Sequence, residues 1–388
     1  MTDARAPRFT PREMLAKLVA FPTVSDRSNL ELIEFVEAYL SAHGVASHRV
    51  VSDCGGKANL YATIGPMAPG GVVLSGHTDV VPVKDQDWHS DPFELTERDG
   101  LLYGRGTCDM KAFIAIALAL VPEMTELERP IHLALSYDEE IGCLGAPRLI
   151  EEMKRELPEI RAVIVGEPTS MRVVTGHKGI FHFDTHVTGK EAHSSQQQRG
   201  VSAVMVAARL ITWLADRQRA NAAAADPASL FEPPYSTLHC GVVQGGTAHN
   251  IMARHCSFVT DIRTLPGEDP RAYFAEYEAF VREVVEPEMQ AISPEAGVRI
   301  DVHANVPGFD SPEASDAVRL AKQLSGQNET EVVPYAAESG QFRDAGFSVA
   351  MCGPGSIDQA HQPNEFISVE QLERGTEFLR RLIRVQSG

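Results

Sequence analysis

The sequence predicts a two-domain α/β protein in which a mainly parallel sheet, covered by helices, is interrupted by an inserted α+β domain. Its 388 residues exceed the usual size of a single hydrophobic core. Strand and helix patterns alternate along the first part of the chain, which is typical of a parallel sheet with helices on both faces. The pattern changes after Gly176 and returns after Pro307, so we expect the first domain to be discontinuous.

Apolar spacing and flanking residues define the elements of the first segment. Pro11 is tolerated in a first helical turn, and Gly44 is suited to end the second helix. A nearly continuous apolar run over residues 111–121 indicates a buried helix. In chain order, we expect helix 11–19, helix 29–43, strands 60–64 and 72–75, helix 111–121, strand 131–137, helix 146–153 and strand 162–165.

The middle segment has the pattern of an antiparallel sheet with one solvated face, because apolar and polar residues alternate from Gly179 to Thr188. The other elements expected there are strands 235–246, 251–263 and 298–302 and helices 201–219 and 270–285. The α/β pattern then resumes with helix 312–324, strands 331–334 and 347–351, and helix 369–385. We therefore expect a first domain formed by residues 1–178 and 305–388, and an inserted domain at residues 179–304.

Composition and charge narrow the classes of partner. The net charge of −18 would repel nucleic acid and anionic membranes, so neither is expected as a partner. Residues 1–11 are polar and lack the apolar core of a signal peptide, and no apolar run reaches the ~18 residues of a membrane span. None of the six cysteines forms a Cys-x-x-Cys pair, which favours free thiols in a reducing compartment. We expect a cytoplasmic protein with a small-molecule partner.

Residues with metal-binding side chains follow the ends of predicted strands or precede a predicted helix. These two histidines and three carboxylates are His77, Asp109, Glu140, Glu167 and His361. Open α/β sheets bind ligands beyond the carboxyl ends of their strands. Nitrogen and oxygen donors of this kind suit zinc, cobalt or manganese, and one bridging carboxylate would let them hold two ions. A pair of ions can activate water and grip a carbonyl oxygen, so the set predicts a two-metal hydrolase.

Neighbouring carboxylates are expected to have different roles. Asp79 would hold the imidazole N–H of His77, and the alternative is that Asp79 is a turn residue. Glu139 would act as general base beside the ligand Glu140, because a carboxylate between cations and a second carboxylate can be tuned toward neutral pH. The alternative is that both glutamates are solvated turn residues. Asp109 would bridge the two metals, and the glycine-rich stretch before it supplies the backbone freedom that this requires.

Three residues of the inserted segment are candidates for binding substrate. His193 would be an oxyanion donor, and the equally weighted alternative is a polar loop histidine. Arg263 is suited to a bidentate grip on a carboxylate, with Asn250 nearby; on its own, Asn250 would be a turn residue after two glycines. Ser194 and Ser195 do not lie in a Gly-x-Ser-x-Gly elbow, so a serine hydrolase is not expected.

The motifs around these residues resemble those of the co-catalytic metallopeptidase family that contains acetylornithine deacetylase, succinyl-diaminopimelate desuccinylase, aminoacylase and a glutamate carboxypeptidase. The likeness covers nearly the whole chain. The segments that carry it are SGHTD at 75–79, GRGTCDMK at 104–111, DEE at 138–140, GEPT at 166–169 and the histidine at 361.

The resemblance implies a zinc-peptidase-like catalytic domain and an inserted lid domain through which the protein forms a homodimer. It also implies two zinc ions, for which cobalt can substitute, and a His193 that reaches the active site of the partner subunit. The ligands implied for the first ion are His77, Asp109 and Glu167, and those for the second are Asp109, Glu140 and His361.

Within the family, the segments at 136–143 and 352–361 look most like those of acetylornithine deacetylase. This likeness implies hydrolysis of N-acetyl-L-ornithine to L-ornithine and acetate, a step of arginine biosynthesis. The segment at 335–342, which contains the candidate substrate-binding residue Gly340, departs from the Thr-Glu-Ala-Gly form of that subgroup. A broader N-acyl-amino-acid hydrolase, a desuccinylase or a dipeptidase therefore stays open. A non-catalytic metal-dependent binding protein is a more remote alternative, which the presence of Glu139 disfavours.

Overall fold

The structure is a computed structural model that describes residues 6–388. Residues 1–5, part of the N-terminal segment for which no signal peptide is expected, lie outside the described residues. The chain divides into two compact units. The first consists of the residues up to Gly176 together with Asp310–Val332 and Ala337–Gly388, and the second consists of His177–Phe309 and Val333–Ala336.

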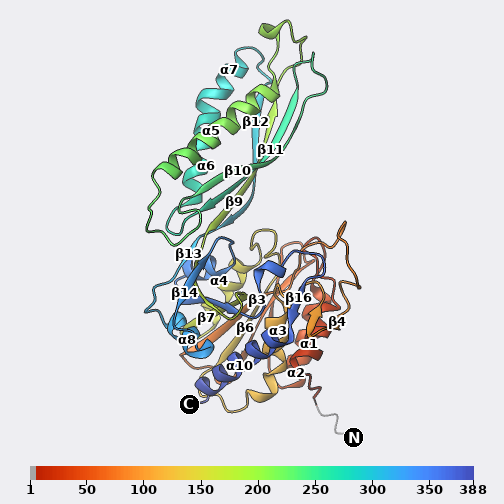
Figure 1. Ribbon diagram of the computed structural model, residues 1–388, viewed down its shortest axis with the longest axis vertical. Helices are drawn as coiled ribbons and strands as arrows, with labels where there is room; N and C mark the ends of the chain where they lie inside the picture. Colours follow the sequence, from red (N-terminus) through yellow and green to blue (C-terminus); the bar gives the residue numbers. More distant parts are fainter. Residues whose placement is uncertain (1–5) are drawn as a thin grey trace. The chain divides into compact units, whose positions relative to one another are not determined.

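The first unit is built on a nine-stranded sheet whose central strands are parallel (Figure 1). Its strands are β1 (Ser47–Val51), β2 (Ala58–Ile64), β3 (Gly71–His77), β6 (Ile131–Ser136), β7 (Ile160–Pro168), β8 (Val173–His177), β13 (Phe309–Asp310), β14 (Thr330–Val333) and β15 (Val349–Gly353). They are arranged in the order β1-β2-β6-β3-β7-β15-β8-β13, with β14 paired to β8. This mixed sheet with a parallel centre confirms the predicted fold class.

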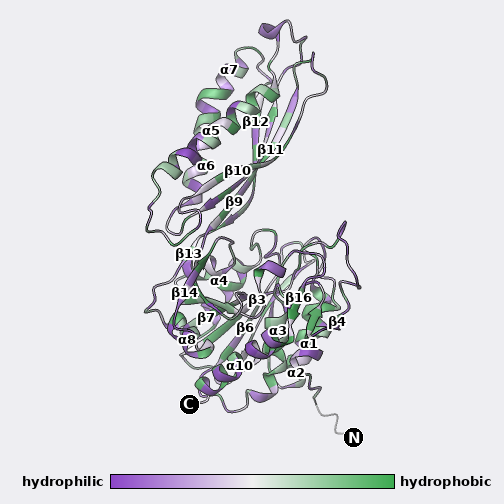
Figure 2. Cartoon of the chain, in the orientation of Figure 1, coloured by the Kyte–Doolittle hydropathy of each residue, from purple (hydrophilic) through white to green (hydrophobic). Residues whose placement is uncertain are grey.

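Helices cover both faces of this sheet. They are α1 (Pro11–Val19), α2 (Leu30–Ala42), α3 (Lys111–Ala119), α4 (Ala146–Glu156), α8 (Asp316–Ser325), α9 (Ser339–Asp344) and α10 (Val369–Gln386). Helices α1, α2, α3, α8 and α10 share one hydrophobic core on one face, while α4 and α9 pack on the other. Every residue of α3 is buried, and Figure 2 shows that the central strands beneath it are mostly hydrophobic.

The second unit is a four-stranded antiparallel sheet with helices on one face (Figure 1). Its elements are β9 (Gly179–Thr188), α5 (Ala203–Ala223), β10 (Thr237–Gly245), β11 (His255–Thr264), α6 (Pro270–Phe280), a π-helical turn (Val281–Val285), α7 (Glu286–Gln290) and β12 (Gly297–Val306). The strand order is β10-β11-β9-β12. Phe181 and Phe183 of β9 pack against the helices, for example on Tyr277, while His182 and Asp184 lie on the open face.

Several short elements differ from the sequence-based expectation. The pattern did not predict β1, β8, β13, α9 or the small sheet formed by β4 (Thr96–Arg98), β5 (Leu101–Tyr103) and β16 (Phe366–Ser368). These segments are too short to show a clear period. Helix α8 begins at Asp316 rather than at residue 312, because the Ser315 side chain caps its first turn by accepting the N–H of Val318. The predicted helix 270–285 continues to Gln290 through the π-helical turn.

Two further observations concern the whole described chain. All six cysteines are free thiols. None of the helices in residues 6–388 combines the length and the apolar character that are needed to cross a lipid bilayer.

Candidate metal centre

The register of the parallel strands brings site residues to one edge of the first unit's sheet. His77 is the last residue of β3 and is paired with Ser136, the last residue of β6. On the other side of β3, Ser75 is paired with Val165 of β7, so the same register places Glu167 beside His77. The carboxyl ends of neighbouring strands therefore deliver an imidazole and a carboxylate next to each other.

Glycines beside these two ligands let the strands pack closely on α3. A Cβ on Gly76 would lie 2.9 Å from a side chain at the start of α3, and a Cβ on Gly166 would lie 2.1 Å from the ring of Phe113. Neither position therefore has room for a side chain. Because side chains alternate across a sheet, His77 and Glu167 point to the face opposite α3.

Asp109 lies at the end of a loop that leads into α3. The backbone of Gly106 in this loop has a φ of 82°, a left-handed conformation that favours glycine. A Cβ there would also lie 2.8 Å from the side chain of Val80. The loop before Asp109 thus contains a position, Gly106, whose conformation and surroundings favour glycine.

The carboxylate of Asp109 connects two groups of ligand-type side chains. One of its oxygens lies 3.0 Å from Nε2 of His77, and the other lies 3.4 Å from Nε2 of His361. Oε1 of Glu167 is 4.0 Å from Nε2 of His77, and Oε2 of Glu140 is 3.0 Å from Nε2 of His361. In each triad the candidate donor atoms lie within 4.8 Å of one another, and no other group in residues 6–388 meets this criterion. The structure thus brings all five predicted ligands together as two triads that share Asp109.

Burial and crowding shift the pKa values of this cluster. Burial, together with the charges of neighbouring carboxylates such as Asp109, raises the pKa of Glu139 to about 8 and that of Glu140 to about 7. Hydrogen bonds to Asp109 and Glu140 raise the pKa of His361 to about 10. Burial also raises the pKa of Glu167 well above its usual value. Burial of Asp109 is outweighed by hydrogen bonds to His361 and His77, which lower its pKa. Glu139, Glu140 and Glu167 are therefore the carboxylates whose ionisation needs added positive charge.

The residues fit a pair of divalent cations. Oε1 of Glu167 is buried and has no hydrogen-bond partner in residues 6–388, although it lies 4.0 Å from Nε2 of His77. A cation between the two groups would satisfy this acceptor. Nδ1 of His77 lies 2.9 Å from the backbone oxygen of Asp79, which leaves Nε2 directed toward the carboxylates. Two imidazoles and three carboxylates form a donor set for zinc, cobalt or manganese, so this is a candidate dinuclear metal centre.

Asp79 supports the centre in two ways. Its backbone oxygen makes the close contact to His77, whose Nδ1 is 3.6 Å from the Asp79 carboxylate. The carboxylate itself accepts the backbone N–H groups of Glu139 at 3.1 Å and Glu140 at 3.3 Å, and the hydroxyl of Ser25 at 2.7 Å. From the sequence, Asp79 was expected only to hold the imidazole of His77. In the structure Asp79 also holds the segment that carries both glutamates.

The adjacent glutamates have different surroundings. Glu140 belongs to the second triad, and its side chain is only 6% exposed. Glu139 belongs to neither triad, and its Oε1 lies 3.4 Å from Sγ of Cys143. Asp138 lies in the turn between the end of β6 and the two glutamates. It has a φ of 56° and forms an ion pair with Lys57. Glu139 is therefore adjacent in sequence to a candidate ligand but is not itself a member of either triad.

Two of the three candidate residues of the second unit lie on adjoining loops. His193 forms an isolated β-bridge with Ile251, and the N–H of Ser194 donates to the backbone oxygen of Asn250 at 3.0 Å. Nδ1 of His193 lies 2.8 Å from the hydroxyl of Ser195, and both His193 and Asn250 are exposed. This loop pair was not evident in the sequence, because its two halves are distant along the chain.

The structure does not bring Arg263 next to Asn250. Asn250 precedes the first residue of β11, His255, whereas Arg263 is close to the end of that strand. An extended strand rises about 3.3 Å per residue, so the two side chains lie at opposite ends of it. Arg263 instead donates from Nε to Asp261 at 2.9 Å. Gly340, in the first unit, is buried within α9.

Sequence reasoning missed three buried charged residues around the centre. Glu338 accepts the hydroxyls of Ser75 at 2.6 Å and Ser136 at 2.8 Å, on the two strands that end at the site. Arg105 and Glu365 form a buried ion pair at 2.7 Å. Arg105 lies in the motif segment at 104–111 and Glu365 follows His361 by four residues, so their position in the chain was an available signal. Their burial was not, since charged residues are rarely buried unless paired.

Comparison with known proteins identifies the family. The family model described as peptidase family M20/M25/M40 matches residues 73–385, which include all five candidate metal ligands. An acetylornithine deacetylase of Myxococcus xanthus is 36% identical over 377 residues, covering 96% of each chain.

Two solved structures agree in fold. A family M20 metallo-carboxypeptidase of Sulfolobus solfataricus has a TM-score of 0.77 at 19% identity and covers 98% of this chain and 99% of its own. A dinuclear metal-binding M20 peptidase of Bacillus subtilis has a TM-score of 0.66 at 16% identity and covers 97% of each chain. At these identities the likeness concerns the fold alone. Together with the family model and the full-length relative, it leads to one conclusion: the chain belongs to peptidase family M20/M25/M40.

Proposed function

We propose that this protein hydrolyses N-acetyl-L-ornithine to L-ornithine and acetate. The observation that carries the proposal is the pair of ligand triads that share Asp109, with Glu139 beside them and outside both. This arrangement suits the hydrolysis of an unactivated amide, which needs both a polarised carbonyl and a general base. The choice of substrate is supported by the 36% identity to an acetylornithine deacetylase over 96% of the chain.

We assign zinc to both positions, with cobalt as a functional substitute. The first ion would be held by His77, Asp109 and Glu167, and the second by the triad that also contains Asp109. When bound, two such ions polarise the amide carbonyl and make water more acidic. The dinuclear metal binding stated for the Bacillus subtilis peptidase is consistent with this assignment.

The protein's own residues then move one proton. Glu139 takes it from the water that attacks the acetyl carbonyl carbon, and returns it to the amine nitrogen as the carbon–nitrogen bond breaks. Burial raises the pKa of Glu139 in the metal-free protein, and nearby cations would lower it again, so its carboxylate can both accept and return a proton near neutral pH. His193 would donate a hydrogen bond to the oxyanion, and Asn250, Arg263 and Gly340 would contact the substrate.

A substrate panel tests the proposed function. Zinc- and cobalt-loaded enzyme should release ornithine from acetylornithine with a higher kcat/KM than it shows for acetylcitrulline, acetylmethionine, succinyl-diaminopimelate or a dipeptide. Amine release can be followed with a ninhydrin or fluorescamine assay. A preference for another compound would replace the substrate but keep the chemistry. If protein shown to contain two ions turned over none of the five compounds, the hypothesis of a non-catalytic metal-dependent binding protein would be favoured.

We propose that the protein is a cytoplasmic enzyme and that its substrate is a small molecule. All six cysteines are free, which is usual in a reducing compartment. The net charge of −18 disfavours nucleic acid and anionic membranes as partners.

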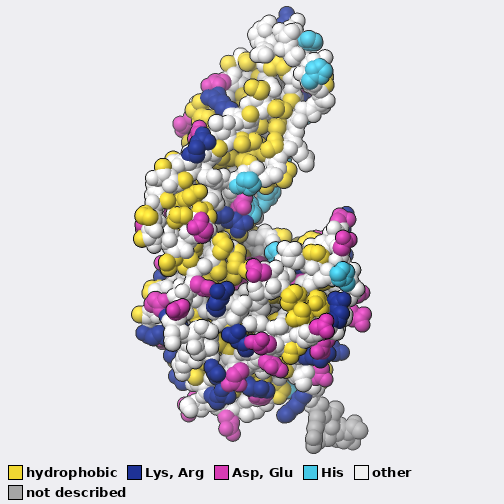
Figure 3. All heavy atoms as spheres, viewed as in Figure 1, with side chains coloured by type: hydrophobic (Ala, Val, Ile, Leu, Met, Phe, Trp, Pro, Cys, Tyr) yellow, Lys and Arg dark blue, Asp and Glu magenta, His cyan; other side chains and the backbone are white. Residues whose placement is uncertain are grey.

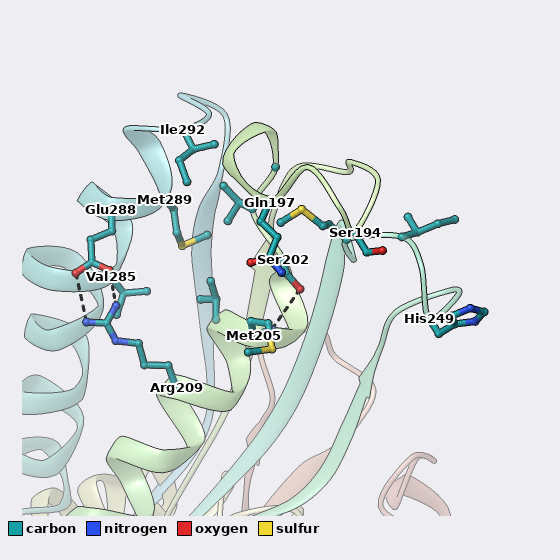
Figure 4. A pocket seen from close by; sticks show the side chains of 15 residues that line it. Ser194, Gln197, Ser202, Met205, Arg209, His249, Val285, Glu288, Met289 and Ile292 are labelled. Carbon is teal, nitrogen blue, oxygen red and sulfur yellow. Dashed lines mark hydrogen bonds and ion pairs between the residues drawn. The ribbon is translucent and has the colours of Figure 1, made fainter.

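We also propose that two copies associate through the second unit. Hydrophobic side chains gather on the part of the second unit that contains α5 and α7 (Figure 3). Met205 of α5 is 70% exposed, and Ile292, which follows α7, is 43% exposed. A cavity of about 500 Å³ opens between these helices, and Ser194 and His249 lie along its edge (Figure 4). Exposed apolar surface of this kind is typical of an interface. A second copy seated here would lie against the loops that carry His193 and Asn250.

Subunit complementation tests whether His193 acts in the partner's site. Inactive His193→Ala protein mixed with inactive Glu139→Ala protein should regain activity after subunit exchange. Random mixing makes about half of the dimers heterodimers, each with one site that has both residues, so activity should approach about a quarter of wild type. Deacetylation rate and light-scattering mass are the measurements. Proven exchange without recovery would place His193 in its own subunit's site or outside the chemistry.

A further inference from the structure

A buried ion pair joins the two loops that carry Asp109 and His361. Nη1 of Arg105 lies 2.7 Å from Oε2 of Glu365, and each side chain is only 1% exposed. Arg105 comes shortly before Asp109 in the chain, and Glu365 comes shortly after His361. The pair therefore connects the chain segments of two ligands that are distant in the sequence.

Glu365 holds the loop that ends in Asp109. Its Oε1 accepts the backbone N–H groups of Cys108 at 2.8 Å and of Asp109 at 3.0 Å, and its Oε2 accepts the N–H of Gly106 at 2.9 Å. With Arg105, donors thus face both ends of the carboxylate. Only an ionised carboxylate offers acceptors at both ends, since an amide has one acceptor end and one donor end.

Arg105 extends the connection to the backbone of His361. Its Nη2 donates to Oε1 of Gln86 at 2.7 Å, and Nε2 of Gln86 donates to the backbone oxygen of His361 at 3.1 Å. Nη1 of Arg105 also lies 3.3 Å from the backbone oxygen of Gln362. His361 has a φ of 62° and a side chain that is 53% exposed. A non-glycine residue in this conformation, with little packing around it, depends on such hydrogen bonds for its position.

The first triad is supported differently. His77 and Glu167 are parts of β3 and β7, two central strands that are hydrogen-bonded on both sides. The hydrogen bonds and ion pairs of Arg105 and Glu365 do not involve either of these residues. Loss of the ion pair would disturb the shared Asp109 in both triads, but the first would keep its two strand-borne ligands.

We propose that Arg105 and Glu365 are positioning residues for the second metal subsite, formed by Asp109, Glu140 and His361, and that the first subsite forms largely without them. This inference rests on the proposed two-metal function. It predicts that the two subsites respond differently to loss of the ion pair. In the second subsite, two of the three ligands, Asp109 and His361, would no longer be held in position. In the first subsite, only Asp109 would be affected.

The test is a metal titration of the Glu365→Gln variant. The substitution keeps the shape of the side chain but turns an N–H₂ group toward backbone N–H donors. We expect affinity for the second ion to fall by about 10- to 100-fold, the usual effect of removing a group that orients metal ligands. The first ion should bind at near wild-type affinity. Metal-free protein is titrated with Co²⁺, followed by visible absorption, and with Zn²⁺ in competition with a chelator of known affinity.

Controls assign the lost ion. Glu123→Gln breaks an ion pair with Arg380 that is exposed, bidentate and in the same unit, and it should leave both affinities unchanged. The cobalt spectrum of singly loaded Glu365→Gln should match that of His361→Ala. Adding Glu365→Gln to His361→Ala should cause little further loss, because both act on the same subsite.

Each outcome decides a different point. If wild type binds fewer than two ions, the proposed two-metal function fails. If wild type binds two and Glu365→Gln binds both as tightly, or loses both equally, the positioning proposal is wrong and the function stands. If thermal melting shows that metal-free Glu365→Gln is unfolded, the same titration of Arg105→Lys decides. That variant keeps the charge but cannot bridge Glu365 and Gln86 with a planar fork, so it too should weaken only the second ion.

Discussion

Exhaustive chelation is expected to abolish amide hydrolysis, and zinc or cobalt is expected to restore it. The triads crowd three carboxylates whose close approach is favourable only with added positive charge, and Oε1 of Glu167 has no hydrogen-bond partner among the residues that the structure describes. Ion content by elemental analysis and acetylornithine turnover are measured before chelation, after it, and after addition of each metal. Activity should rise as ions are restored and reach its maximum at two per chain.

Full activity in protein shown to be free of metal would contradict this expectation. A control for damage by the chelator is the thermal unfolding midpoint, which should return to its starting value when metal is added back. Binding to the folded state stabilises it by mass action, so the midpoint should be lower without metal.

Replacing Glu139 by alanine is expected to lower kcat by about 10²- to 10⁴-fold, the usual contribution of a positioned acid or base. Metal content should stay near two ions, because Glu139 belongs to neither triad. Glu140→Ala should instead lose an ion, since Glu140 lies 3.0 Å from His361 in the second triad. Steady-state kinetics and elemental analysis of the two variants, prepared in parallel, are the measurements.

The isosteric Glu139→Gln variant is the matched control for this comparison. It keeps the contact volume beside Cys143 but cannot accept a proton, so its kcat should fall as far as that of the alanine variant. Equal loss of metal in the Glu139 and Glu140 variants would show that the division of roles between these neighbours is wrong.

The sequence indicated the long elements well, because a central strand or a buried helix has enough residues to show its period. The apolar run at 111–121 became the fully buried α3, and the alternation from Gly179 to Thr188 became β9. The predicted fold class and the resemblance to the metallopeptidase family were confirmed. Short segments such as α9 escaped prediction, because six residues contain less than two helical turns and their conformation is set by tertiary contacts.

Within the site, the sequence alone determined which residues could be ligands: side-chain chemistry and position at strand ends are local properties. Their grouping into two triads was implied by the family resemblance, but the residues alone could not derive it. The grouping depends on the register between β3, β6 and β7 and on the direction of each oxygen of Asp109, which only the tertiary structure shows. The tertiary structure also separated Arg263 from Asn250, since a strand that pairs along its whole length keeps its ends apart. The Arg105–Glu365 pair was equally hidden, because burial of a charge is a property of the packed molecule and not of any segment.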